Sequence, residues 1–311
     1  MSVGGSSVKG VTARPHPETA DLDPSHLGEL PPPTGTSVDE LFLGQKSALD
    51  TLETGVAIHP TALRVSVPRD LGSSVPSIAI VIPTLNENGN VSKLVNQLEV
   101  LMPQEPEIIV VDDGSSDGTV DSVLKLRTQF PRIHLIQRNG RRGIGSAVRE
   151  GIQYALANTA SGYIVTMDAD GSHNPDELPD LLTAARGVDF VQGSRYVDGG
   201  AIKGWPPMRR LLSIVGNNAC RILFQTGFHE HTTFYRVFSR DCAEHIVERV
   251  VDDGYAWGVR SLLESLGAGF RTLEFPITFV ERTNGKSKLG IREIGGWIGS
   301  VARLFVRGRG S

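Results

Sequence analysis

The chain has 311 residues, 39% of them hydrophobic and 21% charged, which is typical of a soluble globular protein with one large or two smaller domains. Its formal net charge of −4 argues against nucleic-acid binding through bulk electrostatics. The two cysteines, Cys220 and Cys242, allow at most one disulfide and favour a reducing cytoplasm. The sequence opens without an apolar secretory segment, and no apolar run reaches about 18 residues. We therefore expect a cytoplasmic protein without a membrane span.

The N-terminal segment 1–75 differs in composition from the rest. It holds 8 of the 18 prolines and no Trp or Tyr, with 5 basic residues against 9 acidic ones. Such a composition cannot bury a core. We predict a disordered or linker extension over 1–75, with at most a short helix at 38–52.

From residue 77 onward, short apolar runs alternate with helical patterns. One such pattern places Val91, Leu94, Val95 and Leu98 at i, i+3, i+4 and i+7. The order β-α-β-α predicts an α/β protein with a doubly wound, mainly parallel sheet, and we place a single domain at 76–290. The runs that have the composition of buried strands are 78–82, 108–111, 133–136, 163–167 and 188–192.

The second half of the chain is less regular. Because Pro276 cannot donate a ladder hydrogen bond, a strand at 270–280 should be bent or lie at a sheet edge. We also expect a strand at 232–238 and helices at 208–224, 243–250, 257–266 and 291–306.

Acidic residues follow three of the predicted strands. Asp168 and Asp170 come directly after the run at 163–167 and, at spacing i and i+2, point to one side of an extended chain. Two carboxylates there repel each other unless a positive charge lies between them, and hard oxygen ligands suit Mg²⁺ or Mn²⁺. Ser172 offers a further oxygen. The alternative is a solvated turn, but ligands of parallel sheets bind at this edge, where 86–87 and 112–113 should also lie.

A glycine-rich loop offers a competing interpretation. Gly143 and Gly145 follow the third predicted strand, and Asp168 ends the next one, which imitates a dinucleotide-binding fold. Position 148 is Val, however, so the G-x-G-x-x-G pattern fails, and the loop does not follow the first strand. We favour a loop that packs a helix against the sheet or borders a nucleotide.

Six segments in order carry recognisable motifs: 81–87, 110–119, 143–147, 167–175, 193–200 and 282–290. Together they resemble one known family, the inverting family 2 glycosyltransferases of the dolichyl/polyprenyl-phosphate mannose synthase type. The resemblance implies a GT-A-like nucleotide-diphospho-sugar transferase fold and a single catalytic domain at 76–290. It also implies a hexosyltransferase that moves a hexose from GDP-mannose or a UDP-sugar to a polyprenyl or dolichyl phosphate, assisted by Mg²⁺ or Mn²⁺.

The resemblance also implies roles for individual residues. Catalysis would fall to Asp170, Glu230 and Arg195. Pro83, Glu87 and Asp113 would line the pocket for the base and ribose, with Asp112 beside them. Asp168, Asp170 and Ser172 would bind the metal. Through the metal, Asp168 would also contact the sugar-nucleotide donor. Arg195, Arg209 and Ser213 would hold the acceptor phosphate. Arg282 and Lys288 would close over the donor phosphates.

One stretch departs from the family pattern. Where the family has acid-x-Thr-Ser-Gly-Phe-Arg, residues 230–236 are EHTTFYR, so bulk replaces a small pair and predicts a reshaped pocket floor. Two alternatives follow: a small soluble hydroxyl acceptor with Glu230 as the general base, or a nucleotide-sugar-binding protein without turnover. His229 and His231 flank Glu230 as ligands or as structural histidines.

The C-terminal segment is basic. Residues 282–311 hold seven Lys or Arg against Glu293 alone. A helix at 291–306 followed by a tail to 311 could lie on an anionic bilayer at the cytoplasmic face, or pack against the catalytic domain.

Overall fold

The computed structural model describes residues 77–102, 105–282 and 291–308, without the side chains of 291–294 and 307–308. All of these residues belong to one compact unit, Ala57–Ser311. The predicted extension at 1–75, its helix at 38–52 and Lys288 lie outside them.

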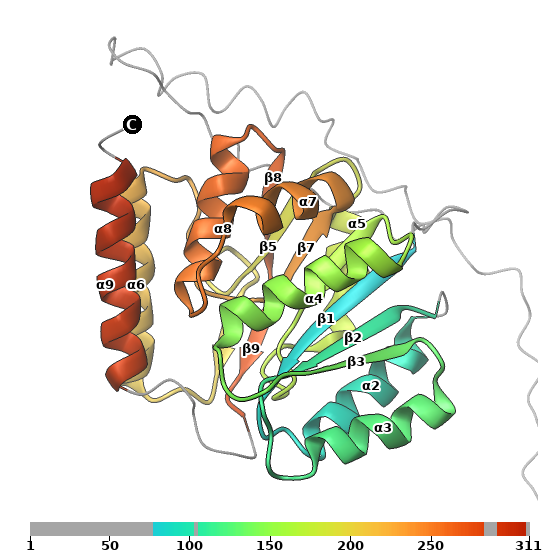
Figure 1. Cartoon of the computed structure of the whole chain (residues 1–311). Helices are drawn as coiled ribbons and strands as arrows, with labels where there is room; N and C mark the ends of the chain where they lie inside the picture. The colour runs from blue at the N-terminus through green and yellow to red at the C-terminus, as the bar shows by residue number, and fades with distance from the viewer. Residues whose placement is uncertain (1–76, 103–104, 283–290, 309–311) are drawn as a thin grey trace, which may run out of the picture. The chain divides into compact units, whose positions relative to one another are not determined.

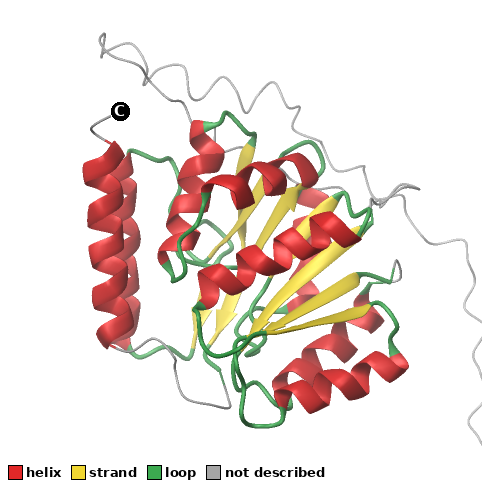
Figure 2. Ribbon diagram, in the orientation of Figure 1, coloured by secondary structure: helices red, strands yellow, loops and turns green. Residues whose placement is uncertain are grey.

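The core of the described unit is a seven-stranded sheet (Figures 1 and 2) in the order β3-β2-β1-β4-β7-β5-β8. Strand β7 pairs antiparallel with both β4 and β5, and the other neighbours pair in parallel. The predicted α/β, mainly parallel, doubly wound sheet is therefore confirmed. The strands are β1 Ile78–Thr84, β2 Glu107–Asp112, β3 Ile133–Gln137, β4 Tyr163–Thr166, β5 Phe190–Ser194, β7 Arg236–Ser239 and β8 Thr272–Pro276.

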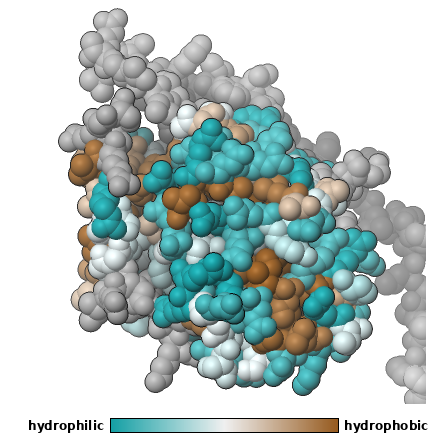
Figure 3. Space-filling view, in the orientation of Figure 1, coloured by the Kyte–Doolittle hydropathy of each residue, from teal (hydrophilic) through white to brown (hydrophobic). Residues whose placement is uncertain are grey.

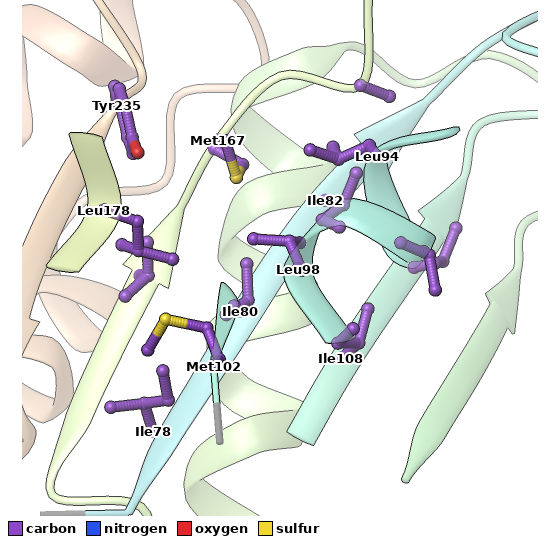
Figure 4. Packing of buried hydrophobic residues seen from close by; sticks show 14 of the residues in the cluster. Ile78, Ile80, Ile82, Leu94, Leu98, Met102, Ile108, Met167, Leu178 and Tyr235 are labelled. Atoms are coloured by element: carbon purple, nitrogen blue, oxygen red, sulfur yellow. The ribbon is translucent and has the colours of Figure 1, made fainter. Parts of the chain in front are cut away.

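Helices cover both faces of this sheet because successive strand residues point to opposite sides. Ile78, Ile80 and Ile82 of β1 pack with α2, α3 and α5 on one face (Figure 4). Ala79 and Val81 pack with α4, α7 and α8 on the other face. The bounds are α2 Asn90–Leu101, α3 Thr119–Gln129, α4 Ile144–Asn158, α5 Leu178–Ala184 after a 3₁₀ turn Pro175–Glu177, α7 Arg240–Arg249 and α8 Ala256–Gly267.

Two predicted strands differ from those observed. The stretch 270–280 divides at Pro276 into β8 and β9 (Thr278–Val280), and β9 pairs with the short strand β6 (Ala201–Lys203) in a second sheet. The break follows from Pro276, which lacks the N–H that a continuing ladder requires. Strand β7 begins only at Arg236, because the preceding residues bond to side chains, as the Tyr235 N–H does to Thr233 Oγ1.

Helices α6 (Pro207–Phe224) and α9 (Ile291–Gly308) run side by side (Figure 1). Val301 of α9 shares a buried cluster with Cys220 of α6 and Val259 of α8, and the Phe224 and Phe305 rings lie 6.3 Å apart. The helix predicted at 291–306 thus packs against the catalytic unit. Neither α6 nor α9 is long and apolar enough to span a membrane, nor is any other helix in the described part of the chain.

Gly151 of α4 allows that helix to lie directly on the sheet. A Cβ at Gly151 would lie 3.0 Å from Val111 Cγ2 and closer still to Val81 Cγ1, whereas a Cβ at Gly296 of α9 would meet nothing within 4 Å. Alanine in place of a mid-helix glycine ordinarily stabilises by about 0.5–1 kcal/mol. We therefore expect Gly151→Ala to lower the free energy of unfolding by about 1–3 kcal/mol, because overpacking outweighs that gain.

Urea denaturation of both variants checks this expectation. Gly296→Ala is the matched control and should be neutral or stabilising. Equal behaviour of the two variants would contradict the close approach of α4 to β1 and β2.

Candidate active site

Strands β1 and β2 end together, and a buried aspartate shapes the turn after them. Asp112 is fully buried, and its Oδ1 accepts hydrogen bonds from the backbone N–H groups of Gly114 (3.2 Å) and Ser115 (2.9 Å). Its Oδ2 accepts from the Thr84 hydroxyl at 3.2 Å, on the neighbouring strand. Asp112 therefore holds the shape of the loop that carries Asp113.

Asp113 joins this loop to the glycine-rich loop. It accepts from the N–H groups of Arg142 (2.8 Å) and Gly143 (2.9 Å), and the buried Arg138 guanidinium lies 2.9 Å from its Oδ1. Gly143 has φ +103°, and a side chain there would collide with the Asp253 carbonyl. Gly143 thus allows the loop to pack closely against Asp253, and its N–H helps to hold the Asp113 carboxylate in place.

The other residues predicted to line the nucleotide pocket lie at the end of β1. Pro83 is half-buried and pairs in register with Val111, while the buried Glu87 accepts from Asn90 at 2.8 Å through Oε2. The Asp113 N–H donates to the Thr84 carbonyl at 2.8 Å. The fold thus brings Pro83, Glu87, Asp112 and Asp113 to one edge of the sheet.

The loop after β4 carries the two aspartates, and a buried histidine holds its backbone. His173 Nδ1 accepts from the Asp168 N–H at 3.0 Å, so its Nε2–H donates to Thr233 Oγ1 at 3.1 Å. Burial lowers the pKa of His173 to about 4, which keeps the ring neutral in this tautomer, and the ring stacks on Tyr235 at 5.0 Å. The sequence offered no signal for this role beyond the position of His173 after the aspartates.

Asp170 is paired with an arginine from the far end of the chain. Arg282 Nη2 lies 2.8 Å from Asp170 Oδ2, and the Ser172 N–H donates to Oδ1 at 3.0 Å. Burial alone would raise the pKa of Asp170, but hydrogen bonding by Ser172 and the charge of Arg282 outweigh burial and lower that pKa. Arg282, predicted at the donor phosphates, here contacts a predicted metal ligand.

The loop after β4 has the chemistry of a Mg²⁺ or Mn²⁺ site. The side chain of Asp168 is 26% exposed and that of Asp170 is 9% exposed. The Ser172 hydroxyl is buried and has no hydrogen-bond partner among the described residues. These oxygens fit a hard cation. The described residues contain no cluster of three or more His, Cys, Asp or Glu arranged for a metal.

Arg195 and Glu230 form a buried, bidentate ion pair. Arg195 donates through Nε (2.6 Å) and Nη2 (2.8 Å) to the two carboxylate oxygens, and Glu230 is fully buried. Burial would raise the pKa of Glu230, but Arg195 and Thr232 hold it at about 2. Such a carboxylate accepts a proton poorly near neutral pH, so this geometry disfavours Glu230 as the predicted general base.

Arg209 and Ser213 of α6 lie near Arg195 through shared aromatic neighbours. The guanidinium carbon of Arg209 lies 4.2 Å from the Trp205 ring centre, and that of Arg195 lies 5.1 Å from the same ring. Tyr196 donates to Ser213 Oγ at 2.7 Å. The structure therefore gathers all three predicted acceptor residues, and both arginines lie against the Trp205 ring, which the sequence did not single out.

The bulk of the 230–236 stretch does not line this site. Phe234 belongs to one face of the core and Tyr235 to the other, and Arg236 is fully buried. Phe234, the bulkier of the two replacements, therefore faces the protein interior, whereas Thr233 Oγ1 contacts His173 Nε2 at 3.1 Å, and a reshaped pocket floor stays a prediction.

A mainly parallel sheet with carboxylates and arginines gathered at one edge is the arrangement that the GT-A-like expectation requires. The family model of glycosyl transferase family 2 matches residues 79–247. The chain is 39% identical over 233 residues to polyprenol monophosphomannose synthase of Mycolicibacterium smegmatis, covering 74% of this chain and 87% of that protein. It is 35% identical over 235 residues to undecaprenyl-phosphate mannosyltransferase of Micrococcus luteus, covering 75% and 95%. The chain belongs to glycosyl transferase family 2 and is a glycosyltransferase.

Solved structures agree on the fold. Glucosyl-3-phosphoglycerate synthase of Mycobacterium tuberculosis with Mn²⁺, UDP and glucosyl-3-phosphoglycerate aligns at TM-score 0.54 and 18% identity, over 73% of this chain and 79% of that one. The same enzyme with Mg²⁺ and UDP aligns at TM-score 0.53 and 19% identity, over 75% and 79%. The GT-A-like fold expected from the motifs is thereby confirmed.

The histidines beside Glu230 both have protein partners. His229 Nδ1 lies 3.0 Å from Glu274 Oε2, and His231 Nε2 lies 2.8 Å from the Thr226 hydroxyl. Burial lowers the pKa of His231 to about 4 from its usual 6.5. These contacts favour structural histidines.

A pH titration of stability tests this assignment of His231. The unfolded chain protonates His231 below its usual pKa of 6.5, whereas the folded protein resists until about 4, so stability should fall as pH decreases between these values. His231→Gln keeps a partner for Thr226 and should reduce the decline between pH 6 and 5 by about 1 kcal/mol per pH unit. Urea unfolding at several pH values measures it, and an unchanged slope would contradict a buried neutral His231.

Proposed function

We propose that the chain is an inverting hexosyltransferase that moves a hexose from GDP-mannose or a UDP-sugar to a polyprenyl or dolichyl phosphate. One observation supports this most strongly. Glu281 contacts Arg209 and its neighbour Arg282 contacts Asp170. Because adjacent Cα atoms lie about 3.8 Å apart, an arginine suited to a phosphate and a carboxylate suited to a metal occupy one small region. The names of both relatives specify polyprenol or undecaprenyl phosphate chemistry.

On the donor side, Pro83, Glu87 and Asp113 would border the base and ribose. Asp168, Asp170 and Ser172 would hold Mg²⁺ or Mn²⁺, which neutralises charge on the departing nucleoside diphosphate. Arg282, and Lys288 outside the described residues, would add positive charge at the same diphosphate.

On the acceptor side, Arg195 and Arg209 would grip phosphate oxygens, with the Ser213 hydroxyl beside them. Arg195 is fixed for this task by Glu230 and by Trp205. An acceptor phosphate is already anionic near neutral pH, so it can attack the anomeric carbon without a general base. A single displacement at that carbon inverts its configuration.

The alternative of a soluble hydroxyl acceptor requires a base, and the geometry of Glu230 disfavours it. With a pKa of about 2 and both oxygens bonded to Arg195, Glu230 would act as a counter-ion. The lipid phosphate therefore remains the favoured acceptor over the hydroxyl.

A lipid acceptor also fits the outer surface of α6. Met208, Leu211, Leu212 and Val215 recur at helical spacing and are 54–66% exposed, while Arg209 and Ser213 lie on the same first turns. Figure 3 shows apolar surface along the left edge, where Figure 1 draws α6 and α9. We propose peripheral contact with the cytoplasmic face of a membrane through α6 together with the basic C-terminal helix α9 and its tail.

Replacement of Asp170 tests the metal and donor assignment. Asp170→Ala should reduce sugar transfer by about 10²–10³-fold, since charge on the leaving diphosphate loses its stabilisation. The assay uses purified protein, Mn²⁺, labelled GDP-mannose or UDP-sugars, and polyprenyl phosphate. The exposed Asp180→Ala on α5 is the control and should retain activity.

The same assay separates the alternatives. Label in the organic phase supports the lipid phosphate, label in a water-soluble product supports the hydroxyl acceptor, and donor binding without transfer supports a binding protein. Near-normal transfer by Asp170→Ala would contradict the donor assignment.

Paired charges on α6 test the membrane contact. Leu211→Glu with Val215→Glu should weaken binding to phosphatidylglycerol-containing vesicles by about tenfold or more, because each apolar side chain contributes about 1.5–3 kcal/mol on burial. Vesicle co-sedimentation measures it. Val100→Glu on α2, where Val100 is 85% exposed, is the control. Equal binding of all three proteins would contradict the α6 surface.

A further inference from the structure

Two consecutive residues occupy both halves of the candidate site with charges of opposite sign. Glu281 accepts hydrogen bonds from Arg209 Nη1 on both carboxylate oxygens, at 2.7 Å for Oε1. Arg282 lies 2.8 Å from Asp170 Oδ2. We refer to these two residues as the 281–282 pair.

Glu281 and Arg282 each take the place of a ligand in the proposed function. Glu281 stands where the acceptor phosphate would bind Arg209, and Arg282 stands where the cation would bind Asp170. A carboxylate with both oxygens on a guanidinium is a close chemical substitute for a phosphate on the same arginine. A guanidinium on Asp170 supplies the positive charge that a divalent cation would otherwise supply. The side chains are only 29% (Arg209), 27% (Glu281), 16% (Arg282) and 9% (Asp170) exposed, so each charge would lose stabilisation without a partner.

The backbone ties the 281–282 pair to the loop of the two aspartates. Glu281 N–H donates to the Lys203 carbonyl at 2.8 Å, and the N–H of the preceding Val280 donates to the Ser172 carbonyl at 3.0 Å. Gly204 lies so close that a Cβ on it would be 2.9 Å from Glu281 Cβ. Glu281 is therefore packed closely against Gly204, on a backbone bonded to both Lys203 and the loop of the two aspartates.

We propose that the 281–282 pair is an internal competitor that couples acceptor binding to donor binding, an inference that rests on the proposed function. Glu281 holds Arg209 until an acceptor phosphate takes its place. Arg282 holds Asp170 until a cation and diphosphate take its place. Because the residues are adjacent, release of one loosens the other, so each ligand should strengthen binding of the other by the same factor.

Removal of the Glu281 charge isolates the acceptor half without any metal. In Glu281→Gln the competitor for Arg209 is neutral, so farnesyl phosphate, a short isoprenyl monophosphate, should bind about 5- to 10-fold more tightly than to wild type when no donor is present. Isothermal titration calorimetry on the full chain measures this affinity.

The coupling is measured by repeating the titration with saturating Mn²⁺ and GDP, or UDP where GDP does not bind. Wild type should then bind farnesyl phosphate at least about fivefold more tightly, while Glu281→Gln should gain less than about twofold. Glu264→Gln, which removes a carboxylate that pairs with His245 on α7, is the matched control and should keep both wild-type values. Glu281→Asp, too short to reach Arg209 in the same way, should behave like Glu281→Gln and serves if that variant does not fold.

The outcomes separate the two proposals. If wild type binds neither farnesyl phosphate nor the nucleotides, the proposed function is wrong and the coupling with it. If wild type binds both and Glu281→Gln shows wild-type affinity and coupling, the proposed function stands and the competitor role is wrong. Weaker farnesyl phosphate binding by the Glu281 variants would also overturn the competitor role, because Glu281 would then be positioning Arg209 for the acceptor.

Discussion

The repulsion between like charges at one edge of the sheet governs this site. Parallel strands bring acidic residues from separate loops to that edge, and each needs a positive partner or hydrogen-bond donors. Asp113 and Glu230 have buried arginines as partners, Arg138 and Arg195. Asp170 is paired with Arg282, which is 16% exposed, and Glu281 with Arg209, which is 29% exposed.

This difference in burial separates structural pairs from exchangeable ones. Breaking a buried pair leaves an uncompensated charge at a penalty of about 3–5 kcal/mol, whereas partly exposed pairs contribute far less. Asp113 and Glu230 therefore set the shape of the site, and a ligand can compete most readily for Arg209, since the side chains of Arg209 and Glu281 are 29% and 27% exposed. Glu230 is the clearest case, since its two oxygens are directed at Arg195 and not at an open space.

The sequence predicted what depends on local pattern, and it failed where a partner lies far along the chain. Buried strands and amphipathic helices follow from periodicities of 2.0 and 3.6 residues. The antiparallel insertion of β7 between β4 and β5 has no such local signature. Nor do the partners of the charged groups, because Arg195 is 35 residues from Glu230 and Arg209 is 72 residues from Glu281.

The departure at 230–236 shows the same limit in a packing problem. Residue by residue, larger side chains in place of a small pair suggest an altered pocket, yet Phe234 stacks on the buried Trp257 at 6.0 Å between ring centres. Gly258 on α8 lies beside Phe234, since a Cβ there would lie 3.7 Å from Phe234 Cζ, an ordinary contact distance. An unusual motif can therefore reflect a change of core packing and need not alter the residues proposed to meet the acceptor.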